Sequence, residues 1–236
     1  MNAKGTNHPP AVATGGGARP IRSSDDANAC KVLTIGHSTR PIDEFVKLLA
    51  AHSVTQLVDV RTVPGSRHNP QFNADSLPAS LGSAGIGYVH APGLGGFRPT
   101  SADSPNDAWR NLSFRGYADY MQSADFDAEL TSLLELAAHD RVALMCAEAV
   151  PWRCHRSLIA DALVVHGIPV CEIAGENRLA LHRLTPFSQV QGTTIMYPPE
   201  TAVVAQKTYG SARPHAHGSD TPFDNPFDNP PKNGDR

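Results

Sequence analysis

The fold class is decided by one stretch, V-A-L-M-C-A-E-A-V-P-W-R-C-H-R-S-L-I-A-D-A-L, which spans residues 142–163. Its first five residues form a short apolar run, typical of a strand buried in a parallel sheet, and we predict a strand from Val142 to Cys146. Apolar residues recur at helical spacing in its second half, which predicts a helix from about Pro151 that buries Leu158, Ile159, Ala162 and Leu163. A buried strand and a helix joined by a short loop are half of a βαβ unit.

The same alternation of strands and helices extends in both directions from this stretch. Short apolar runs predict further strands at Val32 to Gly36, Gln56 to Val60, Gly87 to His90 and Val170 to Ile173. Apolar residues at helical spacing predict helices after Pro41, after Asp75, with Pro78 in its first turn, and after Ser123. We therefore predict a single doubly wound, Rossmann-like α/β domain with about five mainly parallel strands and helices on both faces.

The two ends of the chain differ from its middle in composition. Residues 1–29 are rich in Gly, Pro, Ala, Ser and Asn and lack apolar periodicity, and residues 199–236 are again polar. We expect both ends to be disordered and residues 30–198 to form the α/β domain, because the ends offer too little apolar surface to offset the entropy of ordering. The tandem P-F-D-N-P-F-D-N-P (222–230) is expected to be a flexible tail or a short partner-binding peptide.

Charge and hydropathy exclude several classes of function. The formal net charge of −3 provides no global basic field, so nucleic-acid binding is not favoured and any such contact would be local. The sequence has no apolar run near 18 residues and no hydrophobic stretch at its start, which predicts a cytoplasmic protein without membrane association. The four cysteines form no C-x-x-C pair, so we expect core fillers or reactive groups rather than a disulfide framework.

Chemically active side chains follow the predicted strands, at the edge where ligands bind to open parallel sheets. Five of them are candidate catalytic residues: Cys146, Glu148, His155, Asp59 and His37. Six more are candidate substrate-binding residues: Ser38, Arg61, Arg67, Gly95, Gly96 and Arg156. We predict that Cys146, Glu148 and His155 converge in one cleft, because a short connection keeps the following helix above the end of the strand.

Each candidate also has a structural interpretation. The thiol of Cys146 is either an inert core group or a thiolate stabilised by the helix N-terminus and by Arg156 or His155. Glu148 is either an acid, base or nucleophile, or a carboxylate that caps the following helix or forms a salt bridge with it. Asp59 is either a chemically active carboxylate or a buried group that pairs with Arg61. The arginines describe a phosphate- or carboxylate-sized anion site. We assign no metal, because the adjacent residues Cys154 and His155 are awkward joint ligands.

Six blocks of sequence resemble the family catalogued as domain of unknown function 488, over about residues 31–198. These blocks are T-I-G-H-S-T-R (34–40), L-V-D-V-R-T-V-P-G-S-R-H-N-P-Q-F (57–72), Y-V-H-A-P-G-L-G-G (88–96), G-Y-A-D-Y-M (116–121), A-L-M-C-A-E-A-V-P-W-R-C-H-R-S-L-I-A (143–160) and H-R-L-T-P-F (182–187). The resemblance implies a fold and a set of motifs rather than a reaction. L-V-D-V-R followed by a strand-end cysteine is also similar to rhodanese-type sulfurtransferases, although nine residues separate Cys146 from Arg156.

Three functions are compatible with this pattern. The first is an enzyme acting on an anionic, phosphorylated or nucleotide-like small molecule, with Glu148 and Asp59 as its acid–base or nucleophilic pair. The second is a rhodanese-like thiol enzyme that carries sulfur on Cys146. The third is a nucleotide or nucleic-acid binding module without catalysis. The sequence indicates no particular cofactor and no oligomeric state.

Overall fold

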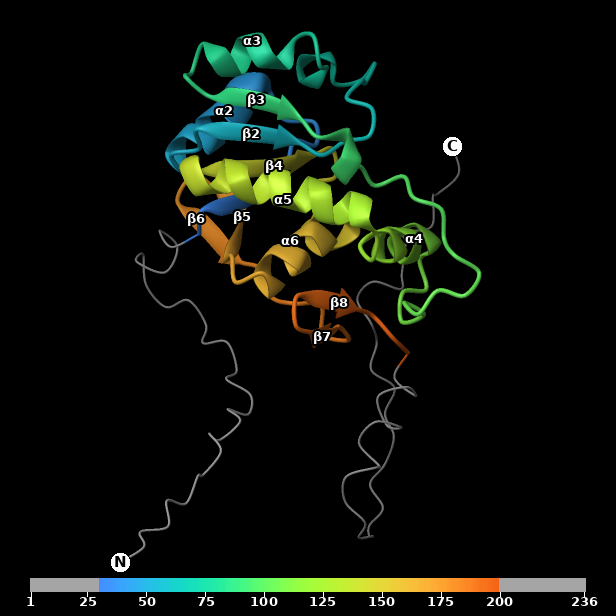
Figure 1. Cartoon of the computed structure of the whole chain (residues 1–236). Coiled ribbons are helices and arrows are strands. Elements are labelled where there is room, and N and C mark those ends of the chain that lie inside the picture. Colours follow the sequence, from blue (N-terminus) through green and yellow to red (C-terminus); the bar gives the residue numbers. More distant parts are fainter. Residues whose placement is uncertain (1–29, 200–236) are drawn as a thin grey trace, which may run out of the picture.

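The computed structural model describes residues 30–199, so the expectations for residues 1–29 and 200–236 lie outside the described residues. Six strands form one sheet in the order β3-β2-β4-β1-β5-β6, in which the first five strands are parallel and β6 is antiparallel to β5 (Figure 1). The strands are β1 Val32–Gly36, β2 Gln56–Asp59, β3 Gly87–His90, β4 Val142–Cys146, β5 Val170–Gly175 and β6 Arg178–Leu181. The predicted α/β class with a mainly parallel sheet is confirmed.

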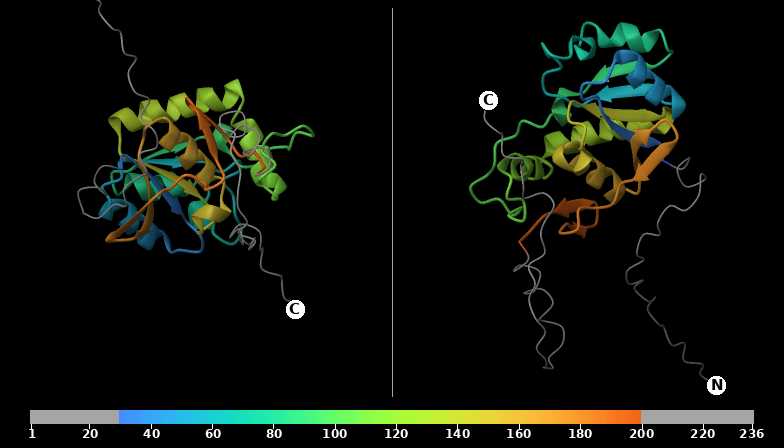
Figure 2. Two further views of the ribbon diagram at one scale, coloured as in Figure 1. Left: turned by 90° about the horizontal axis from the view of Figure 1, so that it is seen from below. Right: turned by 180° about the vertical axis from the view of Figure 1, so that it is seen from behind.

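Helices cover both faces of the sheet (Figures 1 and 2). One face carries α2 Ile42–Ala51 and α3 Leu77–Gly82, and the other carries α4 Leu112–Tyr120, α5 Ala124–His139 and α6 Arg156–Val165. Three short 3₁₀ turns and a separate hairpin complete the described chain: η1 Pro70–Phe72, η2 Pro92–Leu94, η3 Pro151–Arg153, β7 Gln189–Gln191 and β8 Thr194–Met196.

The short apolar strand β4 contributes side chains to the hydrophobic clusters on both faces of the sheet. Its side chains alternate between the faces of the sheet, so Val142 and Leu144 pack in the cluster with α5 and α6. Ala143 and Met145 belong to the second cluster, with α2 and α3. A strand that is buried on both faces loses the polar alternation of a half-exposed strand, which is why its sequence is continuously apolar.

The strand order brings three carboxyl ends together. β4 lies between β1 and β2, with Cys146 in register with Gly36 and Met145 in register with Asp59. The loops that follow β1, β2 and β4 therefore leave the sheet side by side. This arrangement requires a connection from β1 to β2 that crosses over the position of β4.

Several predicted boundaries need correction. The helix predicted from about Pro151 begins at Arg156, because Pro151–Arg153 is a 3₁₀ turn and Cys154 has extended backbone angles. The helix after Asp75 has Ser76 as its N-terminal flanking residue, without a capping side-chain hydrogen bond. The sequence prediction missed α4, β6 and the β7–β8 hairpin.

The cysteine prediction was wrong for one pair. Cys30 and Cys171 are joined by a disulfide, whereas Cys146 and Cys154 are free. Cys30 lies two residues before Val32, where β1 begins to pair with β5, and Cys171 lies in β5, so the two neighbouring strands bring the sulfurs together. The sequence gives no sign of this proximity, because the two cysteines are 141 positions apart.

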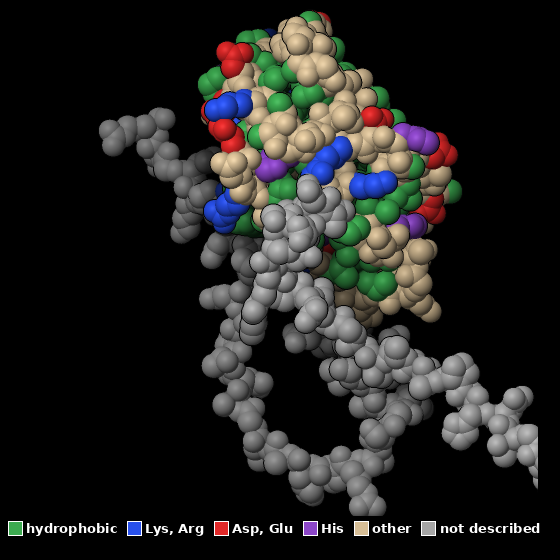
Figure 3. Space-filling view, turned by 90° about the vertical axis from the view of Figure 1, so that its left-hand side faces the viewer, with side chains coloured by type: hydrophobic (Ala, Val, Ile, Leu, Met, Phe, Trp, Pro, Cys, Tyr) green, Lys and Arg blue, Asp and Glu red, His purple; other side chains and the backbone are tan. Residues whose placement is uncertain are grey.

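At the end of the sheet where the strands begin, the visible surface is neither uniformly acidic nor uniformly basic. Figure 3 shows that side of the molecule, and its acidic and basic side chains are interspersed.

Among the described residues, none of the helices is both long enough and apolar enough to cross a membrane.

Candidate functional site

A cavity of about 360 Å³ lies where the strands β2 and β4 end. Four segments line it: the loop after β2, the loop after β3, the start of α4 and the connection from β4 to α6. The lining residues are Arg61, Thr62, Val63, Gly96, Phe97, Ser113, Phe114, Cys146, Ala147, Glu148, Arg153, Cys154 and His155. The three residues that we expected in one cleft, Cys146, Glu148 and His155, thus line the same cavity.

Both free thiols of the chain's four cysteines lie in this cavity. Cys146 is the last residue of β4, and Cys154 directly follows the 3₁₀ turn that precedes α6. The two Sγ atoms and a ring nitrogen of His155 all lie within 4.8 Å of one another. Sequence reasoning named Cys146 and His155 as catalytic candidates and considered Cys154 only as a metal ligand, although the C-H-R triplet at the helix start was a visible signal.

The surroundings of Cys154 favour its thiolate. The Cys146 thiol hydrogen-bonds to its sulfur, and Nε of Arg156 donates to it over 3.4 Å. These two contacts outweigh the effect of burial and hold the pKa of Cys154 well below that of an ordinary thiol. The same hydrogen bond to Cys154, together with burial, raises the pKa of Cys146. When Cys154 is a thiolate, the two cysteines therefore hold one proton between them, and this proton stays on the sulfur of Cys146.

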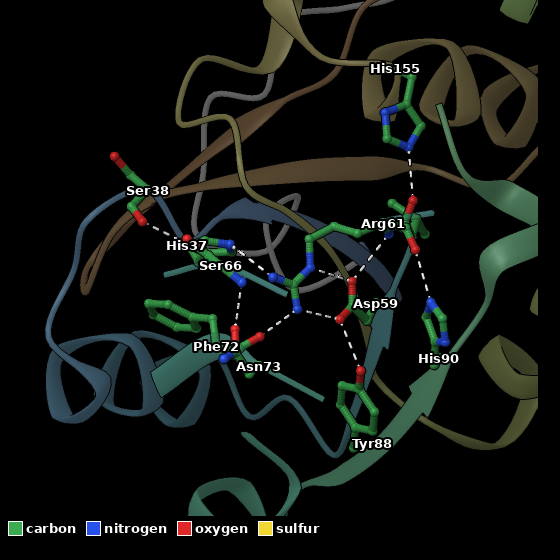
Figure 4. Close-up of polar contacts among 11 residues, drawn as sticks. His37, Ser38, Asp59, Arg61, Ser66, Phe72, Asn73, Tyr88, His90 and His155 are labelled. Carbon is green, nitrogen blue, oxygen red and sulfur yellow. Dashed lines mark hydrogen bonds and ion pairs between the residues drawn. The ribbon is translucent and has the colours of Figure 1, made fainter. Parts of the chain in front are cut away.

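The ring of His155 is held in one orientation. Its Nε2 lies 3.0 Å from the carbonyl oxygen of Val60 and must donate to it, so in the neutral ring Nδ1 carries no proton (Figure 4). Nδ1 lies 3.7 Å from Sγ of Cys154. Gly96 allows this placement, because a Cβ atom there would stand 2.7 Å from Nδ1. His155 can thus accept a proton inside the cavity.

Arg156 is fully buried behind the thiols rather than in the cavity lining. Its Nη2 donates to the carbonyl oxygen of Glu148 over 2.7 Å, and its Nη1 lies 3.8 Å from the carboxylate of Glu172. Burial raises the pKa of Glu172, whose carboxylate also accepts a hydrogen bond from Thr34. Arg156 therefore fixes the loop after β4 and supplies a positive charge beside Cys154.

Asp59 and Arg61 form a buried ion pair at the end of β2 (Figure 4). Asp59 accepts hydrogen bonds from Nε and Nη2 of Arg61, over 2.8 and 2.6 Å, and from the hydroxyl of Tyr88, over 2.9 Å. Arg61 Nη2 also donates to the carbonyl oxygen of Phe72 over 2.6 Å. These bonds occupy both carboxylate oxygens, so Asp59 is bound within the protein and does not line the cavity.

His37 belongs to the same network. Its Nδ1 donates to the carbonyl oxygen of Ser38 over 2.8 Å, so Nε2 accepts from Arg61 over 3.2 Å. Burial is the main cause that lowers the pKa of His37 to about 4, and the charge of Arg61 acts in the same direction. The ring stacks on Phe72, with 4.1 Å between centroids, and is neutral at pH 7.

The structure separates the other predicted residues from the thiols. Ser38, Arg67 and Gly95 do not line the cavity, and Arg67 is exposed. Glu148 lines the cavity, where its Oε1 accepts a hydrogen bond from the Val150 amide over 3.0 Å. Arg153 is exposed on the cavity wall and is the arginine best placed to meet an anion there.

The Cys146–Cys154–His155 cluster also has the composition of a site for a thiophilic metal such as Zn²⁺. Such binding would require both thiols to lose their protons. The sequence prediction that no metal binds stays a prediction.

The fold and the cavity define an α/β protein with a pair of free thiols, one buried and one partly exposed, at the carboxyl end of its parallel sheet. The chain belongs to the family described as Domain of unknown function DUF488, which matches residues 41–163 and thus more than half of the sequence, from α2 into α6. Searches of the curated proteins and of the solved structures found no match. The main resemblance inferred from the motifs is therefore confirmed, and the weaker similarity to rhodanese-type sulfurtransferases has no support from these comparisons.

Proposed function

We propose that this protein is a thiol enzyme that carries sulfur covalently on Cys154 and acts on a small anionic molecule in the cavity. One observation carries the proposal: the two free thiols share a cavity, and the sulfur of Cys154 accepts a hydrogen bond from a buried arginine. A thiolate is the nucleophilic form of cysteine, and a neighbouring cation increases its population. The proposal takes the sulfur-carrier chemistry that was the second alternative from the sequence, moves the sulfur from Cys146 to Cys154, and keeps the anionic substrate of the first.

The alternative acid–base mechanism has less support. Its two carboxylates were Asp59 and Glu148, yet both oxygens of Asp59 are hydrogen-bonded in the ion pair with Arg61. Glu148 already accepts a backbone hydrogen bond. A group that transfers protons to a substrate must reach the substrate, and buried Asp59 does not line the cavity.

The cavity supports an anionic substrate of small size. Arg153 provides an exposed guanidinium at the wall, whereas Arg61 is neutralised by Asp59 and Arg156 lies behind the thiols. The large exposed side chain of Phe97 adds apolar surface to the opening. A sulfane-sulfur anion such as thiosulfate combines negative charge with a polarizable sulfur that a thiolate can attack.

The experiment is to incubate the Cys146→Ser variant of the full chain with thiosulfate under anaerobic conditions and to measure its intact mass. We expect a gain of one sulfur atom, which peptide mapping places on Cys154. The Cys146→Ser, Cys154→Ser double variant is the control and should gain nothing. An unchanged mass of Cys146→Ser with thiosulfate and with inorganic polysulfide would contradict the proposed function.

A further inference from the structure

A protein that only carries sulfur on Cys154 does not require a second thiol beside it, yet Cys146 lies there. Its Sγ lies within 4.8 Å of Sγ of Cys154, and it faces the same cavity. Cys146 is partly exposed in the cavity, whereas Cys154 is almost fully buried. A thiol so placed can reach a sulfur that Cys154 has accepted.

We propose that Cys146 is a resolving thiol, so that sulfur bound to Cys154 leaves as sulfide and the two cysteines form a disulfide. This inference rests on the proposed function and extends it, because it makes the protein a reductase of sulfane sulfur rather than a carrier that passes the sulfur to an external acceptor. An external dithiol would then return the enzyme to its reduced state.

The first step loads Cys154. Its thiolate attacks the sulfane sulfur of thiosulfate, a bond forms between that sulfur and Sγ, the sulfur–sulfur bond of thiosulfate breaks, and sulfite leaves with the bonding electron pair. Arg156, 3.4 Å from Sγ, favours the thiolate before attack. Cys154 then carries a persulfide.

The second step uses Cys146. Its thiol loses its proton to Nδ1 of His155, which is unprotonated because Nε2 donates to Val60. Sγ of Cys146 attacks Sγ of Cys154, and the bond between Sγ of Cys154 and the sulfane sulfur breaks. The sulfane sulfur takes the bonding electron pair and the proton held by His155, and it leaves as hydrosulfide. The sulfane sulfur is reduced by two electrons, and the two thiols are oxidised to one disulfide.

The positions of the two residues suit this reaction. Cys146 is held by the register of β4 with β1, and Cys154 lies outside regular secondary structure in an extended conformation before α6. The approach of the sulfurs from their present separation to a disulfide bond of about 2 Å can therefore be made by the loop without moving the sheet.

The test compares the wild-type chain with Cys146→Ser after one equivalent of thiosulfate under anaerobic conditions. Sulfide release, free thiols and disulfide-linked peptides are measured. Wild type should release one sulfide per chain, lose both free thiols and yield a peptide that links Cys146 to Cys154. Cys146→Ser should keep the persulfide and release no sulfide, and Cys146→Ala should behave in the same way if the serine variant does not fold.

The outcomes separate the two proposals. A wild-type chain that keeps its persulfide without forming the disulfide overturns the resolving role of Cys146 and leaves the proposed function intact. Absence of a persulfide in Cys146→Ser, together with absence of sulfide release in wild type, overturns the proposed function itself. Sulfur found on Cys146 in Cys154→Ser would show that the two roles are reversed and would also overturn the inference.

His155 provides a further check. His155→Gln should slow sulfide release by roughly 10²-fold, because the proton of Cys146 loses its acceptor, and it should slow this release far more than it slows persulfide loading in the Cys146→Ser background. His139→Gln is the matched control, since His139 is exposed at the end of α5, and it should release sulfide at the wild-type rate. Equal rates in all three proteins would contradict the role of His155 in resolution.

Discussion

At the scale of the residue, the reactivity of Cys154 depends on Arg156. We predict that Cys154 is alkylated by iodoacetamide with a midpoint below the pH of about 8.5 that is typical of a free thiol, because the low pKa of Cys154 keeps the thiolate populated. Arg156→Lys should raise that midpoint, since a lysine has one charged point and cannot contact both the sulfur and the Glu148 carbonyl oxygen. The midpoint of alkylation is measured in each protein by mass spectrometry of peptides after timed alkylation. The same midpoint in both proteins would contradict this role of the guanidinium.

Gly96 gives a second prediction at this scale. Gly96→Ala should displace the His155 ring, because the new methyl group would stand 2.7 Å from Nδ1. We expect at least about tenfold slower sulfide release after persulfide loading. Gly65→Ala is the matched control, since no atom lies within 4 Å of the methyl group it would add. If both variants retain the wild-type rate, the ring position does not depend on Gly96.

At the scale of the element, the end of β2 is held by the ion pair of Asp59 and Arg61. Arg61→Met should lower the free energy of unfolding by about 3–5 kcal/mol, because it leaves a buried carboxylate without its cation. Lys47→Met removes an exposed pair with Glu176 and should cost less than about 1 kcal/mol. Urea denaturation at pH 7 measures both losses. Equal losses would show that the buried pair has no special structural role.

The start of α6 illustrates how element boundaries decide the site. Helical spacing in the sequence predicted a helix from about Pro151, and it identified the buried face correctly. It could not show that Cys154 is extended, since that conformation follows from the preceding 3₁₀ turn and from the contacts of Arg156 with the loop. In a helix running through residue 154, the side chains of Cys154 and His155 would point in different directions. For this reason the sequence argued against their joint ligation of a metal ion.

At the scale of the whole molecule, stability should depend on pH through His37. The folded protein keeps the pKa of His37 at about 4, whereas an unfolded chain takes up the proton near pH 6.5. The unfolded state therefore binds more protons between these values, and the free energy of unfolding should fall by on the order of 1–2 kcal/mol from pH 7 to pH 5. His37→Gln should remove this part of the loss, as urea denaturation at the two pH values can measure. An unchanged pH dependence in the variant would contradict the assignment.

The disulfide between Cys30 and Cys171 gives another prediction for the whole molecule. It closes a loop across 141 residues, so reduction should lower the free energy of unfolding by about 2–4 kcal/mol. Urea denaturation with and without a phosphine reductant measures the difference. A double variant, Cys30→Ala with Cys171→Ala, should not respond to the reductant. A wild-type protein that unfolds at the same urea concentration under both conditions would count against this stabilisation.

The sequence by itself determined the α/β class, five parallel strands, and the location of the cavity at the carboxyl ends of those strands. Burial on two faces and helical spacing are local patterns, so a single segment is enough to reveal them. It also placed Cys146, Glu148 and His155 together, since a short loop limits how far they can separate. Only the tertiary structure decided that the Cys154 sulfur contacts Arg156 and His155, that of the two alternatives for Asp59 the pair with Arg61 is formed, and that Cys30 meets Cys171. These contacts depend on strand order and on backbone angles in loops, which arise from packing between segments far apart in the chain rather than from any pattern within one segment.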